Sequence, residues 1–151
     1  DPIPAPDGRH CDAEILLSMP GVGTIVGATV LAEAATALQD RNYQRFRTLA
    51  GLAPVTKASG KRKHGTKYAR VSMRYACSGP LRNAIHHMAS IAVRHDPAAT
   101  AHYERLRTNG ASYGRALRGV ADRLARILFA ALRSHSLYDP TRLTVVYAKA
   151  T

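Results

Sequence analysis

The stretch RALRGVADRLARILFAALR, residues 115–133, carries the strongest amphipathic pattern in the chain. Its apolar residues recur at the spacing of one face of an α-helix. This face consists of Leu117, Val120, Ala121, Leu124, Ile127, Leu128, Ala131 and Leu132. The rest of the helix surface carries arginines: Arg115, Arg118, Arg123, Arg126 and Arg133. The pattern therefore predicts a core helix with a basic outer surface.

The composition of the chain points to a polyanionic partner. With 151 residues and 46% apolar content, the chain is long enough for one compact domain with its own core. Lys and Arg number 22 against 10 Asp and Glu, which gives a formal net charge of +12. Because such a charge attracts polyanions, we expect a nucleic-acid partner, and a basic protein without one stays as an alternative.

The cysteines and the hydropathy pattern indicate where in the cell the protein is located. Cys11 and Cys77 lie far apart and lack the paired spacing of a zinc site or a disulfide scaffold, which favours a reducing, cytoplasmic setting. No apolar run approaches the roughly 18 to 20 residues that a transmembrane helix needs, so we expect no membrane association. The first residues also lack the pattern of a signal peptide.

The chain divides into three predicted parts. The alternating prolines of DPIPAP, residues 1–6, indicate a linker. We therefore expect residues 1–11 to lead from a further N-terminal domain, and residues 12–140 to form the domain itself. Residues 141–151 are expected to be a short strand or a disordered tail.

The sequence predicts a mainly helical domain with an N-terminal helix-hairpin-helix element and a basic loop or short β-hairpin between helices. Asp12, Asn42 and the pair Asp96-Pro97 have the pattern of helix starts. Ser72 is expected to cap a long helix, which Gly79-Pro80 either kinks or delays until Pro80. The expected helices cover residues 12–18, 24–38, 43 to about 51, 72 or 80 to 95, 97–109 and the stretch around 115–133.

The turn Pro20-Gly21-Val22-Gly23 matches the helix-hairpin-helix element. Glycines such as Gly21 and Gly23 allow the backbone to approach a phosphate closely. Amides at the start of the next helix, at Thr24, can donate to phosphate oxygens without reading the base sequence. An ordinary turn between helices is the alternative, and the charge of +12 favours phosphate contact.

The segment 55–70 is rich in cations and contains no acidic residue. We predict that it binds phosphates through Lys57, Lys61, Arg62, Lys63, Lys67 and Arg70. The hydroxyl of Ser59 lies among these cations, which would neutralise a phosphodiester under attack by the serine. A flexible phosphate-binding loop without chemistry is the alternative, because no general base is evident nearby.

Two further arginines follow this segment. Arg74 and Arg82 are eight residues apart, so on one continuous helix they would share a face and flank a phosphate track. A solvated basic face is the alternative. His86 and His87 have no partner at the spacing of metal ligands, and we predict no metal site in this domain.

Several short motifs occur in a specific order. They are residues 15–23, Ala32-Glu33, residues 46–54, Ser59-Gly60, Arg74, Ala76-Cys77, residues 81–84, Tyr103, Gly110 and residues 116–124. This ordered set, over residues 12–140, resembles the C-terminal transposase domain of the IS-one-ten insertion-sequence family. The chain departs from the family at residues 74–78, where an Arg-Gly-Asn-like stretch is common.

The resemblance implies a bridge-RNA-guided recombinase that forms a covalent phosphoserine link to DNA. It implies that an N-terminal RuvC-like domain supplies acidic residues and magnesium, and that Ser59 is the nucleophile. DNA, a guide RNA and further copies of the full-length protein are the implied partners. The isolated fragment is expected to be inactive, since its own acidic residues are scattered singly.

We thus expect the C-terminal domain of a DNA transposase that binds DNA and supplies a serine for strand cleavage and exchange. A non-catalytic helix-hairpin-helix module that binds DNA or RNA is the alternative. The expected catalytic residue is Ser59. The expected nucleic-acid-binding residues are Gly21, Gly23, Thr24, Lys57, Lys61, Arg62, Lys63, Lys67, Arg70, Arg74 and Arg82.

Overall fold

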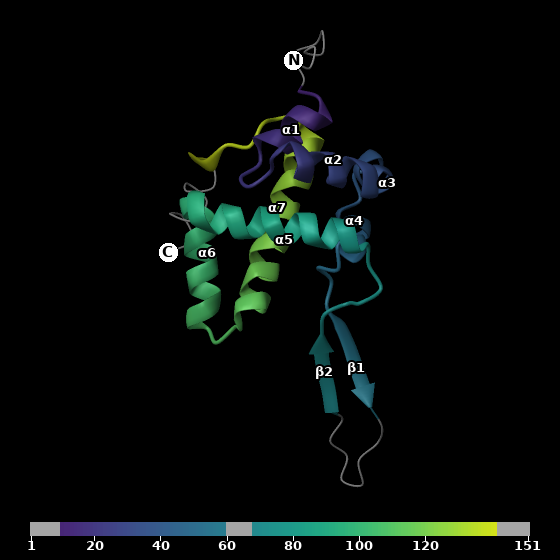
Figure 1. Ribbon diagram of the computed structural model, residues 1–151, viewed down its shortest axis with the longest axis vertical. Coiled ribbons are helices and arrows are strands. Elements are labelled where there is room, and N and C mark those ends of the chain that lie inside the picture. Colours follow the sequence, from purple (N-terminus) through teal and green to yellow (C-terminus); the bar gives the residue numbers. More distant parts are fainter. Residues whose placement is uncertain (1–9, 60–67, 142–151) are drawn as a thin grey trace.

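The computed structural model describes residues 10–59 and 68–141, without the side chains of residues 58, 59 and 68–70. The described residues form seven α-helices and one two-stranded antiparallel sheet, as Figure 1 shows. The elements are α1 (Asp12–Ser18), α2 (Thr24–Glu33), α3 (Ala35–Gln39), α4 (Tyr43–Leu49), β1 (Val55–Ser59), β2 (Tyr68–Ser72), α5 (Gly79–His95), α6 (Pro97–Thr108) and α7 (Tyr113–Ser134). The predicted fold class is confirmed.

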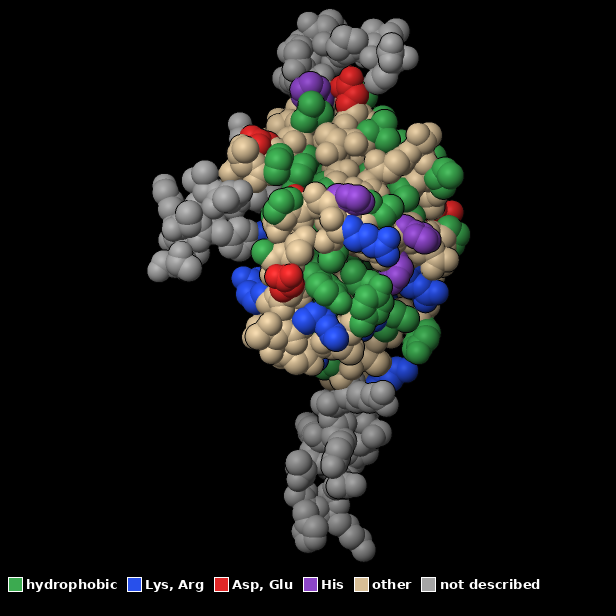
Figure 2. All heavy atoms as spheres, turned by 60° about the vertical axis from the view of Figure 1, so that its left-hand side comes forward, with side chains coloured by type: hydrophobic (Ala, Val, Ile, Leu, Met, Phe, Trp, Pro, Cys, Tyr) green, Lys and Arg blue, Asp and Glu red, His purple; other side chains and the backbone are tan. Residues whose placement is uncertain are grey.

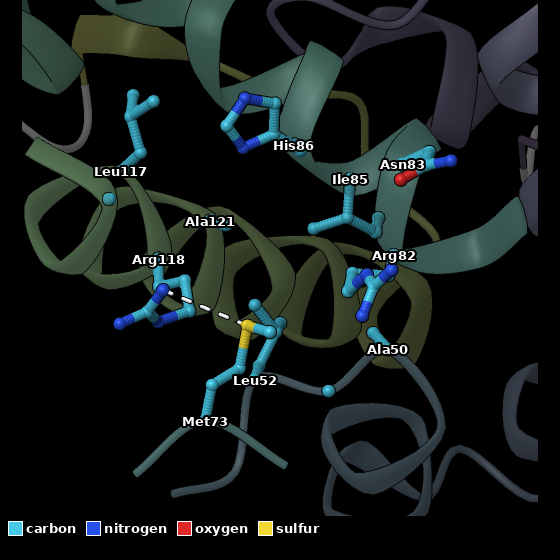
Figure 3. Close-up of a pocket in the computed structure, with 12 residues that line it drawn as sticks. Ala50, Leu52, Met73, Arg82, Asn83, Ile85, His86, Leu117, Arg118 and Ala121 are labelled. Atoms are coloured by element: carbon cyan, nitrogen blue, oxygen red, sulfur yellow. Dashed lines mark hydrogen bonds between the residues drawn. The ribbon is translucent and has the colours of Figure 1, made fainter. Parts of the chain in front are cut away.

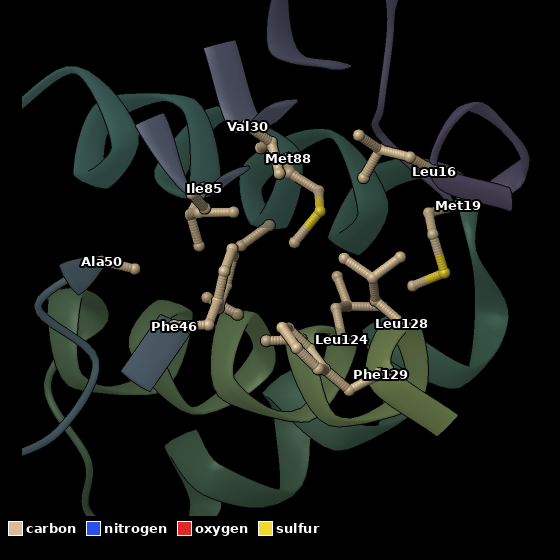
Figure 4. Packing of buried hydrophobic residues seen from close by; sticks show 14 of the residues in the cluster. Leu16, Met19, Val30, Phe46, Ala50, Ile85, Met88, Leu124, Leu128 and Phe129 are labelled. Carbon is tan, nitrogen blue, oxygen red and sulfur yellow. The ribbon is translucent and has the colours of Figure 1, made fainter. Parts of the chain in front are cut away.

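Helix α7 lies at the centre of the core, and its predicted apolar face is buried. Val120, Leu124 and Leu128 are each at most 2% exposed. The ring of Phe129 lies 5.3 Å from the ring of Phe46 in α4, in the cluster that Figure 4 shows. Burying this face removes apolar surface from water on several sides of one helix, so α7 organises the other helices around it.

Helix α5 crosses α7 and buries Ile85 and Met88 against it. The start of α5 corrects the prediction for Ser72, which ends β2 and does not cap the helix. The cap is Ser78, whose Oγ accepts a hydrogen bond from the amide of Leu81 at 3.2 Å. Pro80 fits the first turn because its missing N–H would have no helical partner there.

The helices α1 and α2 form the predicted hairpin, but the N-cap of α1 is not Asp12. Cys11 occupies the N-cap of α1, and Asp12, the first helical residue, binds Arg41 through two hydrogen bonds of 2.6 and 2.8 Å. In the turn, Gly21 has a φ of +78°, and a Cβ there would lie 2.2 Å from the carbonyl oxygen of Met88. The turn therefore packs backbone to backbone against α5.

The predicted helix 24–38 is wrong in one respect, because the structure divides it at Ala34 into α2 and α3. The local sequence contains no helix breaker, so propensity favoured one continuous helix. The change of direction lets α2 bury Val30 while α3 buries Ala37 and Leu38 in the same core. Tertiary packing thus overrides the local preference.

Two predicted helix starts are confirmed. The side chain of Asn42 accepts the amide of Arg45 at 2.9 Å at the start of α4. The buried carboxylate of Asp96 accepts the amide of Ala99 at 3.0 Å at the start of α6. The hydroxyl of Tyr138 also donates to Asp96, at 3.1 Å, and burial together with Asp96 raises the pKa of Tyr138, so the phenol keeps its proton.

The sequence predicted either a basic loop or a short β-hairpin between the helices, and the segment 55–72 forms the hairpin. The strands pair from Val55 with Ser72 to Ser59 with Tyr68. They project from the helical body (Figure 1). The backbone hydrogen bond from the amide of Ser78 to the carbonyl of Leu49, 2.9 Å long, joins the chain after β2 to the end of α4.

Among the described residues, no helix combines the length and the apolar character needed to cross a bilayer.

Replacing Gly21 by alanine should destabilise the fold, because the new Cβ would overlap the carbonyl of Met88 at a positive φ. We expect the free energy of unfolding to fall by about 1–3 kcal/mol, the range for overpacked sites. Gly23→Ala is the matched control, since Gly23 has an extended backbone and open space around its Cβ position. Urea denaturation measures both, and equal losses would contradict the packing role of Gly21.

Candidate nucleic-acid interface

The hairpin carries part of the predicted site. Lys57 is exposed in β1, and its backbone pairs with that of Arg70 in β2. Ser59 is the last residue of β1. The side chains of Ser59 and Arg70 lie outside the described part, as do Lys61, Arg62, Lys63 and Lys67 entirely.

The predicted helical pairing of Arg74 with Arg82 is wrong. Arg74 lies in the loop between β2 and α5, and only Arg82 lies on α5. The prediction assumed a helix that begins at Ser72, but the strand pairing extends to that residue. Both arginines nonetheless lie close in sequence to the root of the hairpin, and Arg82 lines a cavity there.

The α1–α2 turn, which contains Gly21 and Gly23 and leads into α2 at Thr24, lies on the other side of α5 from the hairpin (Figure 1). Gly23 and Thr24 are exposed at the N-terminus of α2. The space beside Gly21 is filled by the carbonyl of Met88. The structure therefore divides the predicted set into two separate groups, and gives Gly21 a packing role of its own.

A groove lies where the hairpin joins the helical body, and we name it the hairpin-root groove. It consists of two cavities of about 280 and about 510 Å³. Gly51, Leu52, Met73 and Arg118 line both cavities, so the two are adjacent. The groove thus combines residues from the end of α4, from β2 and the chain after it, and from α5 and α7.

The smaller cavity has an apolar lining with a basic edge. Leu52, Met73 and Leu117 contribute apolar surface, and Arg82 and Arg118 reach it from α5 and α7 (Figure 3). The guanidinium of Arg118 donates to the sulfur of Met73 at 3.8 Å. Because a thioether sulfur is a weak acceptor, Arg118 keeps most of its capacity to donate to a ligand.

The larger cavity contains Arg47 and Arg115 together with one carboxylate, that of Asp122. The carboxylate accepts from Arg47 Nε at 2.9 Å and from the hydroxyl of Tyr43 at 2.5 Å. Burial and the hydrogen bond to Asp122 raise the pKa of Tyr43, which keeps this phenol protonated. Asp122 thus joins α4 to α7, and it is the one acidic residue of the groove's described lining.

Two buried polar atoms at the hairpin root have no hydrogen-bond partner among the described residues. They are Oγ of Ser72, which lines the larger cavity, and Nε of Arg74. Buried polar groups in proteins are nearly always hydrogen-bonded, so such atoms call for an explanation. Both can donate, and an anionic ligand in the larger cavity would offer oxygen acceptors to the hydroxyl of Ser72.

An exposed aromatic ring borders the same cavity. Tyr75 is 74% exposed, and the ammonium group of Lys57 lies 5.7 Å from the centre of its ring. An exposed aromatic ring with a cation beside it is a typical contact for a nucleic-acid base and its phosphate.

Sequence reasoning assigned no ligand contact to Arg47, Tyr75, Arg115 or Arg118. Arg115 and Arg118 were visible as cations on the polar side of the core helix, three residues apart and therefore neighbours on its surface. Tyr75 follows Arg74 directly, and an aromatic residue within a basic stretch is a signal for nucleic-acid contact. Their convergence depends on tertiary structure.

Charge and chemistry at this face suit a polyanion. On the face that Figure 2 shows, most of the Lys and Arg side chains lie in the half nearer the hairpin. No group of three or more His, Cys, Asp or Glu residues in the described part of the chain could hold a metal ion. A basic helical domain with an arginine-lined groove is the type of protein that binds phosphate-bearing polymers.

Comparison with known proteins identifies the family. Residues 13–104 match the transposase IS116/IS110/IS902 family, and the chain belongs to this family. It is 39% identical over 141 residues to the IS900 42 kDa protein of Mycobacterium paratuberculosis, with 90% of this chain and 33% of that protein covered. It is 37% identical over 138 residues to the IS117 mini-circle protein of Streptomyces coelicolor, with 89% of this chain and 31% of that protein covered.

A third relative is the IS110 43.6 kDa protein of Streptomyces coelicolor, 32% identical over 130 residues, which cover 86% of this chain and 31% of that protein. The chain spans about a third of the length of the curated relatives it matches.

Replacing Asp122 by alanine should lower the free energy of unfolding by about 2–3 kcal/mol, since it leaves Arg47 and Tyr43 without their shared acceptor. Asp40→Ala is the control, because the Asp40–Arg45 pair has exposures of 54% and 50% and should contribute less than about 0.5 kcal/mol. Thermal or urea unfolding measures both variants. If Asp122→Ala lowers the free energy of unfolding no more than Asp40→Ala does, Asp122 does not hold α4 and α7 together.

Proposed function

We propose that this chain is the C-terminal domain of a DNA transposase, that it binds DNA on the side of the hairpin, and that Ser59 is the nucleophile for strand cleavage. Family membership supports the transposase assignment. The observation that carries the DNA-binding part is the hairpin-root groove, where Arg47, Arg82, Arg115 and Arg118 meet one carboxylate, which is already engaged. Ser59 lies on the strand that rises from this groove.

The proposed reaction is a transesterification. The hydroxyl oxygen of Ser59 attacks the phosphorus of a phosphodiester, a new P–O bond forms to the serine, and a bond to one deoxyribose oxygen breaks. The hydroxyl proton leaves to a base, and the departing deoxyribose oxygen gains a proton. The energy of the ester is kept in the phosphoserine link, so rejoining to another strand needs no external energy source. Cations around the phosphate stabilise the charge that develops in the transition state.

The intact transposase supplies the parts that this chain lacks. In this proposal an N-terminal RuvC-like domain holds the magnesium that the family resemblance implies. A guide RNA that selects the DNA sites, and a homo-oligomer that brings several strands together, complete the proposal. On this account the isolated chain binds DNA without cutting it.

A non-catalytic role is the second candidate, and the α1–α2 turn supports it. The exposed residues Gly23 and Thr24 at the N-terminus of α2 can donate their amides to a phosphate of DNA or RNA. Such a contact needs no serine chemistry. The two candidates therefore separate on Ser59.

The test is strand cleavage by the intact transposase with its RNA, comparing the native protein with Ser59→Ala. A covalent protein–DNA adduct that survives denaturation should form with the native protein and disappear in the variant, while DNA binding persists. Ser112→Ala serves as control, because Ser112 is exposed and its side chain makes no capping hydrogen bond. An adduct that persists in Ser59→Ala would move the chemistry to another residue.

A further inference from the structure

We propose that the hairpin-root groove binds an unpaired DNA strand next to the phosphodiester that Ser59 attacks, with Tyr75 as the platform on which a base stacks. This inference rests on the proposed function and deepens it by naming the state of the DNA that the groove holds. Three observations carry it: the exposed ring, the apolar lining of the smaller cavity, and the donors that face the larger one.

The exposed ring favours unpaired bases. Tyr75 is 74% exposed at the edge of the larger cavity, although an aromatic ring normally gains stability from burial. The face of a base is free to stack on such a ring only when the base has left the duplex. Lys57, 5.7 Å from the centre of the ring, lies where it can pair with the phosphate of the stacked nucleotide.

The apolar cavity gives a second reason. Its volume of about 280 Å³ and its lining by Leu52, Met73 and Leu117 suit a flat apolar group with a polar edge. In duplex DNA the phosphates face outward and the bases are shielded, so an apolar cavity gains nothing from a duplex. Arg82 and Arg118 border this cavity and can hold the backbone of a strand whose base enters it (Figure 3).

The donors at the root match a sugar-phosphate backbone. The hydroxyl of Ser72 and Nε of Arg74 are buried and lack a partner among the described residues. Arg115 is exposed at the same cavity. Ser72 from β2 and Arg115 from α7 thus line the larger cavity, where phosphate oxygens along a strand would accept hydrogen bonds from both, and Arg74 lies in the loop that directly follows β2.

The position of the groove links it to the reaction. From Val55 at the root to Ser59 at the end of β1, four residues span about 13 Å at roughly 3.3 Å per residue. This is about the length of four base steps of a strand at roughly 3.4 Å each. A strand that leaves the groove along the hairpin would therefore reach Ser59 within a few nucleotides of the stacked base.

Fluorescence anisotropy of the 151-residue chain tests the proposal with three labelled probes of equal length: single-stranded DNA, the same sequence as RNA, and duplex DNA. Tyr75→Ala should weaken binding of single-stranded DNA by about 5- to 150-fold, the range for loss of one base–aromatic stack. Binding of the duplex should change less than about twofold. Tyr75→Phe should restore the affinity, because it keeps the ring.

Two controls make the result specific. Tyr113→Ala removes another exposed tyrosine, whose ring contacts Tyr103 of α6, and should leave single-strand binding unchanged. Arg118→Ala should reduce the slope of log affinity against log salt concentration by about 0.7 for the single strand. Arg94→Ala, at the far end of α5, should not.

Equal losses for duplex and single strand, or no loss in Tyr75→Ala, would overturn the proposal. A larger loss of affinity for the RNA probe than for single-stranded DNA in Tyr75→Ala would also overturn it. In each of these cases the chain still binds nucleic acid, whereas failure to bind any probe would contradict the proposed function itself. The thermal melting of Tyr75→Ala should match that of the native chain, since the side chain is largely exposed.

Discussion

The apolar face of α7 has to leave water, and the rest of the structure depends on that constraint. Helices α1, α4, α5 and α6 all contact α7, and most of the large buried side chains belong to this helix or face it. Since the apolar face of α7 is buried in the core, the arginines of α7 remain on its outer surface. At its N-terminal half, Arg115 and Arg118 therefore meet the segment that enters and leaves the hairpin.

The root of the hairpin is held more firmly than a surface loop would be. Asp122 ties α4 to α7 through Arg47, and the amide of Ser78 bonds to the end of α4. Gly51, with a φ of +70°, brings its backbone close to Cys77, where a Cβ would lie 3.0 Å from the sulfur. A fixed root has a functional advantage, because catalytic and binding groups act best from preorganised positions.

This arrangement separates two tasks. The helical body supplies the core and a basic groove, while the strand from Val55 to Ser59 carries the proposed nucleophile away from the body (Figure 1). The turn between α1 and α2, on the other side of α5, packs through Gly21 and offers only the amides at the start of α2 to a ligand. The groove is therefore the larger and more basic of the two candidate surfaces.

Much of the fold could be predicted from the sequence, because local signals control helix starts and amphipathic faces. The face of α7 and the caps at Asn42 and Asp96 are such cases. The prediction that Ser72 caps a helix was wrong because a serine before a helical segment has the same local signature whether it caps the helix or ends a strand. The break at Ala34 could not be predicted because tertiary packing causes it, and not local helix propensity.

The candidate site was less accessible to sequence reasoning. The cations of residues 55–70 were visible as a run, but the groove joins Arg47, Tyr75 and Arg118 from segments far apart in the chain. No spacing rule connects such positions, since their proximity arises from how the helices pack. The family resemblance was specific because it rests on the order of several motifs, and the comparisons confirm it.

We propose that Ser59 carries the DNA strand, and the most direct measurement is to locate the covalent link itself. The intact transposase would be trapped on its DNA substrate, digested with protease and nuclease, and the nucleotide-bearing peptide sequenced by mass spectrometry. We predict a single modified residue, Ser59. A nucleotide on Ser72 or on any other residue would contradict it.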